Sequence, residues 1–137
     1  MTRTEARELM MQVFFQMEAC SDFDVNSRDK YLSQEVIRSQ RDYCNELYSI
    51  LCNKKAEIDT MLETYSKNWK LHRMPKTDVA VLRVSACEMV YLHIPAAVSI
   101  NEAVDLAKLY GTEDSAKYVN AILGKIAANC IRRDEEA

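Results

Sequence analysis

The sequence has few of the residues that interrupt helices. Its 137 residues include only two glycines and two prolines, which argues against a turn-rich β protein. It also lacks any apolar run of about 18 residues, the length that spans a membrane. Its first residues, Met-Thr-Arg-Thr-Glu, are not followed by the apolar segment of a secretory signal. We therefore expect a single domain over residues 1–137, located in the cytoplasm and without membrane contact.

Excess positive charge and metal-ligand spacing are missing too. The formal net charge is −3, whereas proteins that bind nucleic acid mainly through phosphates usually carry a basic excess. The five cysteines include no Cys-x-x-Cys pair, and their odd number argues against a complete disulfide framework. No Gly-rich phosphate loop, nucleophile elbow or zinc-protease motif occurs. We therefore expect no enzymatic activity, no metal and no cofactor, and any RNA binding must come from a local patch.

Apolar residues recur at helical spacing along most of the chain. In the first segment they follow the i, i+3, i+4 pattern of one buried helix face: Ala6, Leu9, Met10, Val13, Phe14 and Met17. Similar patterns predict further helices over about 28–39, 42–65, 77–91, 100–110 and 116–130. The segment 77–91 is apolar on most of its circumference, which is typical of a central helix. Lysines at 54 and 55 leave open whether 42–65 is one helix or two. The fold class is all-α, with about six or seven helices.

Three residue patterns predict where helices begin and end. Thr2 and Glu5, and likewise Ser99 and Glu102, have the spacing of a capping box, so we expect helices to begin directly after Thr2 and Ser99. Gly111 follows the last apolar position of its segment. We expect it to end that helix in the left-handed conformation that glycine adopts readily.

Two groups of residues have the chemistry for RNA contact. Arg3 and Arg7 are four residues apart, so a helix points them the same way, and guanidinium groups suit phosphate oxygens. Tyr110, Lys117 and Tyr118 flank a short polar joint, where tyrosines can stack on bases while the lysine contacts the backbone. Taken alone, these residues favour a simpler interpretation, with solvated arginines and tyrosines at the edge of the core.

The longest motifs lie in the C-terminal third. Residues 95–108 read Pro-x-x-Val-x-Ile-Asn-Glu-Ala-Val-x-Leu-Ala-Lys, and residues 111–120 read Gly-x-Glu-Asp-Ser-x-Lys-aromatic-Val-Asn. Earlier segments add Ala-Arg-Glu followed by glutamine and aromatic residues at 6–16, a tryptophan at 69, and an acid, Leu-Arg and a glutamate at 78–88. This set of motifs covers essentially the whole chain and resembles the NusB family of bacterial transcription antitermination factors.

The resemblance implies a helical RNA-binding factor that is not an enzyme. It implies pairing with NusE, a small-subunit ribosomal protein, binding of the boxA element of nascent ribosomal RNA, and action within the RNA polymerase antitermination complex. By position, it implies that the RNA-facing residues are Arg3, Arg7, Phe15, Tyr110, Asp114, Lys117 and Tyr118. It puts Asp78 near NusE, although helix capping explains Asp78 and Asp114 equally well. Thr4 and Glu5 stand where the family commonly has arginines, so we expect weak RNA binding without NusE.

Two alternatives remain open at this point. One is a stand-alone accessory domain related to the N-terminal part of some ribosomal RNA methyltransferases. The other is a homodimeric scaffold in which Met11, Phe15 and the aromatic edges form the interface and hide the same groups from RNA.

Overall fold

The computed structural model describes residues 1–67 and 69–131, and within them the regular structure is helical, with no strand. The seven α-helices of this part of the chain are α1 (Arg3–Cys20), α2 (Arg28–Tyr31), α3 (Gln34–Ile37), α4 (Arg41–Thr64), α5 (Lys76–Val90), α6 (Ala96–Tyr110) and α7 (Ser115–Cys130). Three short 3-10 helices join them: η1 (Val25–Ser27), η2 (Arg38–Gln40) and η3 (Leu71–Arg73). The predicted all-α class is confirmed. None of the described helices combines the length and apolar character needed to cross a membrane.

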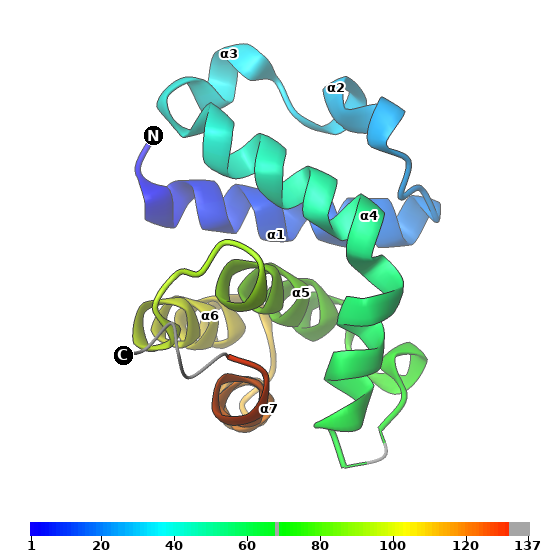
Figure 1. Cartoon of the computed structure of the whole chain (residues 1–137), viewed down its shortest axis with the longest axis vertical. Helices are drawn as coiled ribbons and strands as arrows, with labels where there is room; N and C mark the ends of the chain where they lie inside the picture. The colour runs from blue at the N-terminus through cyan, green and yellow to red at the C-terminus, as the bar shows by residue number, and fades with distance from the viewer. Residues whose placement is uncertain (68, 132–137) are drawn as a thin grey trace.

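Helix α5 occupies the centre of the molecule. Every residue from Asp78 to Met89 is buried, and α5 packs against α1, α4, α6 and α7. Figure 1 shows α5 nearly end-on, with α1 and the first half of α4 on one side and α6 and α7 on the other. The sequence pattern predicted this central position correctly, because a helix that is apolar all round needs neighbours on every side.

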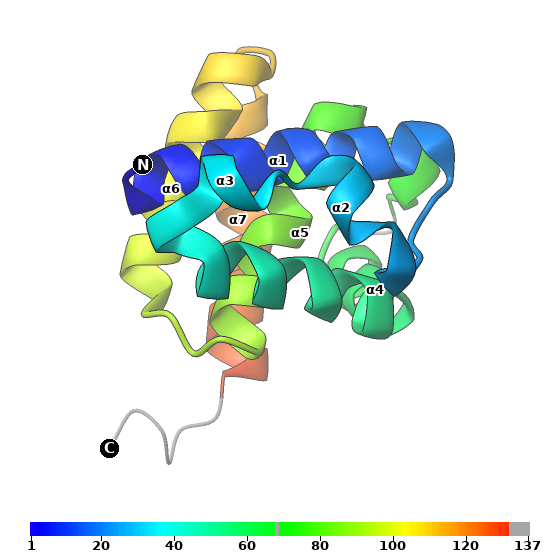
Figure 2. The ribbon, with the colours of Figure 1, turned by 90° about the horizontal axis from the view of Figure 1, so that it is seen from above.

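The other helices form two groups around α5. Seen from above, α1 crosses α6 and α7: α1 runs from side to side in the view, whereas α6 and α7 run from top to bottom (Figure 2). The short helices α2 and α3 lie on the side of α1 that faces away from α6 and α7 (Figure 1). Helix α4 is continuous but kinked, because Lys54 has non-helical backbone angles (φ −120°, ψ 15°). The interruption seen in the sequence therefore marks a kink within one helix.

Of the three predicted helix ends, two lie where the sequence placed them, after Thr2 and before Gly111. The Thr2–Glu5 capping box is present, with both reciprocal hydrogen bonds. The Ser99 cap is wrong, because α6 already begins at Ala96, directly after Pro95, whose fixed φ suits a helix start. Gly111 is not left-handed, having a φ of −98°. It is required for space, since a Cβ there would lie 2.4 Å from Ser115 Oγ.

Candidate nucleic-acid interface

Arg7 lies inside the fold and not on the surface expected to face RNA. It is only 5% exposed. Its Nε donates to Glu88 Oε2 at 2.7 Å, and its Nη1 pairs with Glu102 Oε1 at 3.2 Å. The phosphate contact expected of Arg7 does not fit this position, because the guanidinium group is buried and already bound to two carboxylates.

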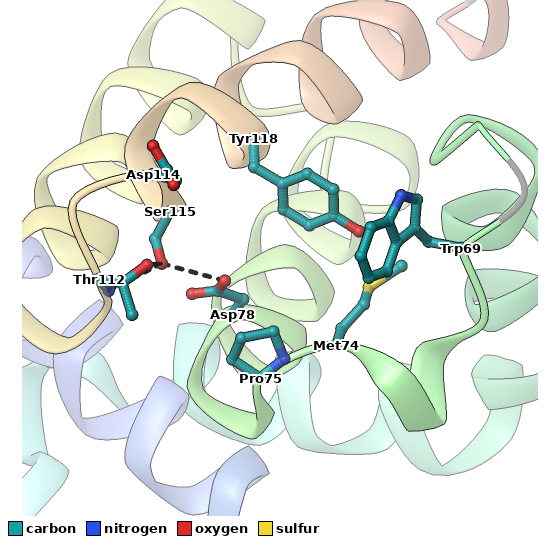
Figure 3. A pocket seen from close by; sticks show the side chains of 8 residues that line it. All are labelled: Trp69, Met74, Pro75, Asp78, Thr112, Asp114, Ser115 and Tyr118. Atoms are coloured by element: carbon teal, nitrogen blue, oxygen red, sulfur yellow. Dashed lines mark hydrogen bonds between the residues drawn. The ribbon is translucent and has the colours of Figure 1, made fainter.

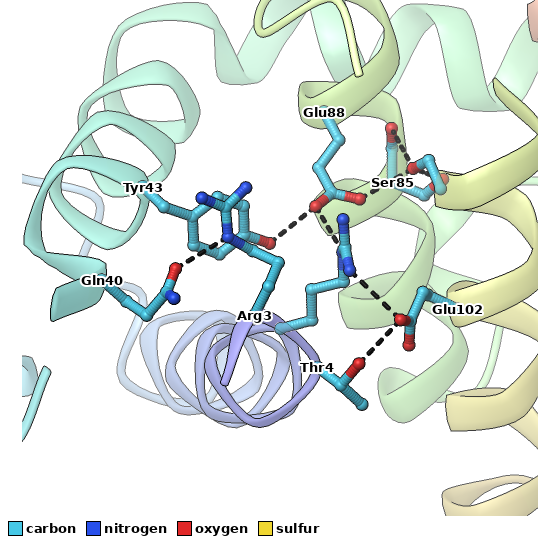
Figure 4. Close-up of polar contacts among 9 residues, drawn as sticks. Arg3, Thr4, Gln40, Tyr43, Ser85, Glu88 and Glu102 are labelled. Atoms are coloured by element: carbon cyan, nitrogen blue, oxygen red, sulfur yellow. Dashed lines mark hydrogen bonds and ion pairs between the residues drawn. The ribbon is translucent and has the colours of Figure 1, made fainter. Parts of the chain in front are cut away.

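Glu88 of α5 is the centre of this buried network. Besides the bond from Arg7, its carboxylate accepts hydrogen bonds from Tyr43 Oη at 2.7 Å and from Ser99 Oγ at 2.8 Å. Figure 4 shows Tyr43 reaching this carboxylate from α4. Burial, together with the charge of Glu88 and its hydrogen bond, raises the pKa of Tyr43. A buried carboxylate is tolerated when it is paired and hydrogen-bonded, so Glu88 holds α1, α4, α5 and α6 together.

Arg3 is exposed but faces a different flank of α1. Its guanidinium carbon lies 4.2 Å from the centre of the Tyr43 ring, and its Nε donates to Gln40 Oε1 at 2.7 Å. In Figure 4, Arg3 points towards Tyr43 and Gln40, while Thr4 points to Glu102 on the opposite side of the helix. The structure therefore does not bring Arg3 together with the residues around Tyr110.

Phe15 and Tyr110, by contrast, lie on one surface. The Tyr110 hydroxyl donates to the Glu8 carboxylate and accepts from Gln12 Nε2 at 2.9 Å, which ties the end of α6 to α1. The bond to Glu8 raises the pKa of Tyr110. Residues 8, 12 and 15 share one helix face by their spacing, so Phe15 follows on the same side of α1. Both aromatic side chains are exposed, 39% for Phe15 and 37% for Tyr110. Met11 is only 1% exposed, so it cannot belong to the dimer surface considered from the sequence.

A pocket lies where the connection between α4 and α5 meets the start of α5 and the start of α7. It encloses about 290 Å³. Figure 3 shows the side chains that line it: Trp69, Met74, Pro75, Asp78, Thr112, Asp114, Ser115 and Tyr118. The rings of Trp69 and Tyr118 are 6.5 Å apart between centroids and meet edge to face at 71°. Three residues singled out in the sequence, Asp78, Asp114 and Tyr118, therefore share one site.

Asp78 is the electrostatic peculiarity of this pocket. Its side chain is buried, with the residue 3% exposed, and its Oδ2 accepts from Ser115 Oγ at 3.1 Å. Among the described residues, neither Asp78 Oδ1 nor the buried Tyr118 hydroxyl has a hydrogen-bond partner. Burial raises the pKa of Asp78, and the bond from Ser115 opposes that rise only in part. Burial and then the charge of Asp78 raise the pKa of Tyr118.

The capping roles considered for the two aspartates are not present. Asp78 sits in the first turn of α5 after Pro75, and its bond goes to Ser115 of α7. Asp114 occupies the residue before α7 but makes no side-chain capping bond, and it is exposed. Lys117 is also exposed, and it lines a second depression between α6 and α7, beside Asn101 and Asn120.

Sequence reasoning missed most of the pocket wall, above all Trp69 and Ser115. Trp69 is 54% exposed, and the signal in the sequence was that the only tryptophan of the chain lies in a short connection outside the predicted helices. Ser115 had no comparable signal, because its bond to Asp78 joins positions 37 residues apart. The described part of the chain contains no His, Cys, Asp and Glu cluster suited to a metal ion.

Comparison with known proteins agrees with the motifs. Residues 4–128 match the NusB family model. The chain is 39% identical over 127 residues to the transcription antitermination protein NusB of Alkaliphilus oremlandii, covering 91% of this chain and 92% of that protein. The Listeria monocytogenes protein of the same name is 38% identical over 128 residues, covering 93% and 97%. The fold is similar to that of T. maritima NusB, with a TM-score of 0.89, 28% identity, and coverage of 99% of this chain and 97% of that one. The chain therefore belongs to the NusB family.

Proposed function

We propose that this protein is a transcription antitermination factor that binds boxA-type RNA of nascent ribosomal transcripts together with NusE. Antitermination is supported by membership of the family and by the names of its relatives. The RNA part rests chiefly on one observation: Tyr110 is bonded to Glu8 and Gln12, so the exposed rings of Phe15 and Tyr110 belong to one surface. Exposed aromatic rings of this kind stack on splayed bases of single-stranded RNA.

The distribution of charge favours RNA binding together with NusE over RNA binding by this protein alone. The net charge is −3, Arg7 is bound to two carboxylates, and Arg3 lies against Tyr43. Lys117 is the predicted phosphate contact that remains exposed next to the 111–114 segment. With so few cations, the protein alone should bind RNA weakly, and we propose that NusE docks near Asp78 and supplies positive charge.

Fluorescence anisotropy of labelled boxA RNA, with and without NusE and over a range of salt concentrations, tests this function. Phe15→Ala should weaken binding about 5- to 150-fold, since a base stacked on an aromatic ring contributes about 1–3 kcal/mol. Val36→Ala is the matched control, because Val36 is 58% exposed on α3, on the other side of α1 (Figure 1).

The lysine is tested in the same assay. Lys117→Ala should lower affinity for all RNA sequences alike and reduce the salt slope by about 1. Lys30→Ala is its control, because the side chain of Lys30 is 63% exposed. Lys30 belongs to α2, which lies on the side of α1 that faces away from α6 and α7 (Figure 1). Unchanged boxA affinity in the Phe15→Ala, Lys117→Ala double variant, with NusE present, would remove this surface from the proposal. A stable dimer in light scattering that binds no RNA would favour the scaffold instead.

A further inference from the structure

We propose that the pocket lined by Trp69, Asp78 and Tyr118 is a binding site for a guanidinium group. The proposal deepens the proposed function. It rests on that function in one respect only, the identity of the protein partner that would supply an arginine. A guanidinium group could equally reach the pocket as free arginine or a related small molecule. The site itself is argued from the charges and rings that line it.

The first step concerns the missing positive charge. Asp78 is buried, and it makes no ion pair within the described part of the chain. The described lining contains a second carboxylate, Asp114, and no lysine, arginine or histidine. A buried carboxylate without a cation is costly. Asp78 Oδ1 and the Tyr118 hydroxyl have no partner, so two unused acceptors belong to the same pocket.

The second step is an internal precedent on the same helix. Arg83 of α5 is 2% exposed, and it binds both oxygens of Asp59, Nε at 2.9 Å and Nη2 at 3.0 Å. Its guanidinium carbon lies 5.5 Å from the centre of the Phe23 ring. Here a buried guanidinium group, a partly buried carboxylate and an aromatic ring lie together. The Trp69 pocket has the carboxylate and two rings but lacks the guanidinium group.

The third step selects the chemistry of the occupant. A guanidinium group is flat, stacks on aromatic faces and is less strongly hydrated than an ammonium group, so it suits a pocket lined by Trp69 and Tyr118. Its several N–H groups match two separate acceptors. A nucleotide of RNA would bring its phosphate groups towards Asp78 and Asp114, and like charges repel. The charges of the pocket therefore favour a cation over RNA.

The experiment uses the full chain and its own fluorescence, because Trp69 is the only tryptophan. N-acetyl-arginine amide is titrated against the protein, and the citrulline analogue, which has the same shape without the charge, is the matched probe. We expect a saturable change for arginine and binding weaker by about tenfold or more for citrulline, since charge-assisted hydrogen bonds are the strong ones. The lysine analogue should bind between the two.

Variants locate the response. Asp78→Asn should weaken arginine binding about tenfold or more, whereas Glu113→Gln should not, because Glu113 is exposed and does not belong to the pocket wall. Circular dichroism checks that each variant is folded. If Asp78→Asn does not fold, the comparison of arginine with citrulline on the unmodified protein still decides. Agmatine and an Ala-Arg-Ala peptide separate the two sources: tighter peptide binding identifies a protein side chain, and tighter agmatine binding identifies a small molecule.

Three results would overturn the proposal: no saturable response to arginine, an equal response to citrulline, or a response to guanosine monophosphate alone. The titration contains no RNA and no NusE, so it can fail while boxA binding stays intact. It can also succeed when boxA binding fails.

Discussion

Helix α5 carries two buried carboxylates, Glu88 and Asp78, that differ in the number of their hydrogen-bond partners. Glu88 accepts hydrogen bonds from Arg7, Tyr43 and Ser99, all between 2.7 and 2.8 Å. Asp78 accepts one, from Ser115 at 3.1 Å, and has no ion pair among the described residues. Both residues are almost inaccessible, 1% and 3% exposed. The two carboxylates therefore differ in their partners and hardly at all in their burial.

The number of partners distinguishes a structural group from a candidate site. The partners of Glu88 come from α1, α4 and α6, so the carboxylate fixes the packing of three helices on α5. Asp78 binds one helix, α7, and leaves one oxygen unused beside a pocket. Unsatisfied buried polar atoms are uncommon in folded proteins. Their occurrence together with exposed Trp69 is what directs attention to the pocket.

The largest effect on stability is expected when Glu88 loses one of its partners. Arg7→Ala leaves Glu88 buried without a cation, and we expect a loss of about 3–5 kcal/mol in the free energy of unfolding. Urea denaturation measures it. Arg3→Ala is the control, and because Arg3 is exposed it should cost about 1 kcal/mol or less. A loss for Arg7→Ala as small as that for Arg3→Ala would show that the ion pair is not structural. If Arg7→Ala does lose this much stability, a loss of RNA binding in the same variant reports a damaged fold and not a missing RNA contact.

A smaller effect is expected where the single partner of Asp78 is displaced. In Gly111→Ala the new Cβ would lie 2.4 Å from Ser115 Oγ and 2.7 Å from the Ala107 carbonyl oxygen. Ser115 must move, and Asp78 loses its one donor, so we expect about 1–3 kcal/mol of destabilisation from overpacking.

Gly124→Ala is the matched control for that substitution, because outside the neighbouring backbone of its own helix no atom lies within 4 Å of a Cβ at Gly124. It should stabilise helix α7 by up to about 1 kcal/mol. Thermal unfolding of both variants gives the comparison. A stable Gly111→Ala protein would mean that the segment between α6 and α7 adapts without disturbing Asp78.

The sequence predicted one helix over 28–39, where the structure has α2 and α3, separated by Leu32 and Ser33. It predicted the other helices well, because apolar periodicity depends on local spacing. It predicted the Thr2–Glu5 cap for the same reason, since the two residues are neighbours along the chain. It misjudged Arg7, whose ion-pair partner Glu88 is 81 positions away. Two signals were nevertheless available: the apolar Met11 follows Arg7 by one helical turn, and Glu88 lies in a mostly apolar helix, where a buried carboxylate requires a partner.

The candidate site was harder to predict than the fold. The pocket is lined by the connection between α4 and α5, by the start of α5, and by the segment from Thr112 to Tyr118, so its members are far apart along the chain. Tyr118, Asp114 and Asp78 could be singled out one by one, but their meeting depends on how α7 packs on α5. The need for glycine at 111 follows from the same packing, because the backbone there passes close to Ser115. Spacing along the sequence does not contain this information.

The smallest effect concerns the pH dependence of stability. Burial raises the pKa of Asp78 in the folded protein. At a pH between the pKa of this carboxyl in the unfolded protein and its pKa in the folded protein, the folded state therefore binds one proton more than the unfolded state. Stability is then lost as the pH rises through the folded pKa, and the loss is complete above it. Asp78→Asn lacks this loss, so it should gain stability relative to the original protein as the pH rises.

Thermal unfolding from about pH 4 to pH 8 measures this difference, with Asp114→Asn as the control from the same pocket wall. Tyr118 faces Asp78 too, but the pKa of its hydroxyl is raised from an already alkaline value, so it does not titrate in this range. Saturating N-acetyl-arginine amide should cancel the loss, because a bound cation favours the ionised carboxylate. Asp78 would then behave like Glu88, with a guanidinium partner of its own. An equal pH dependence in the original protein and in Asp78→Asn would mean that this carboxylate is not penalised by its burial.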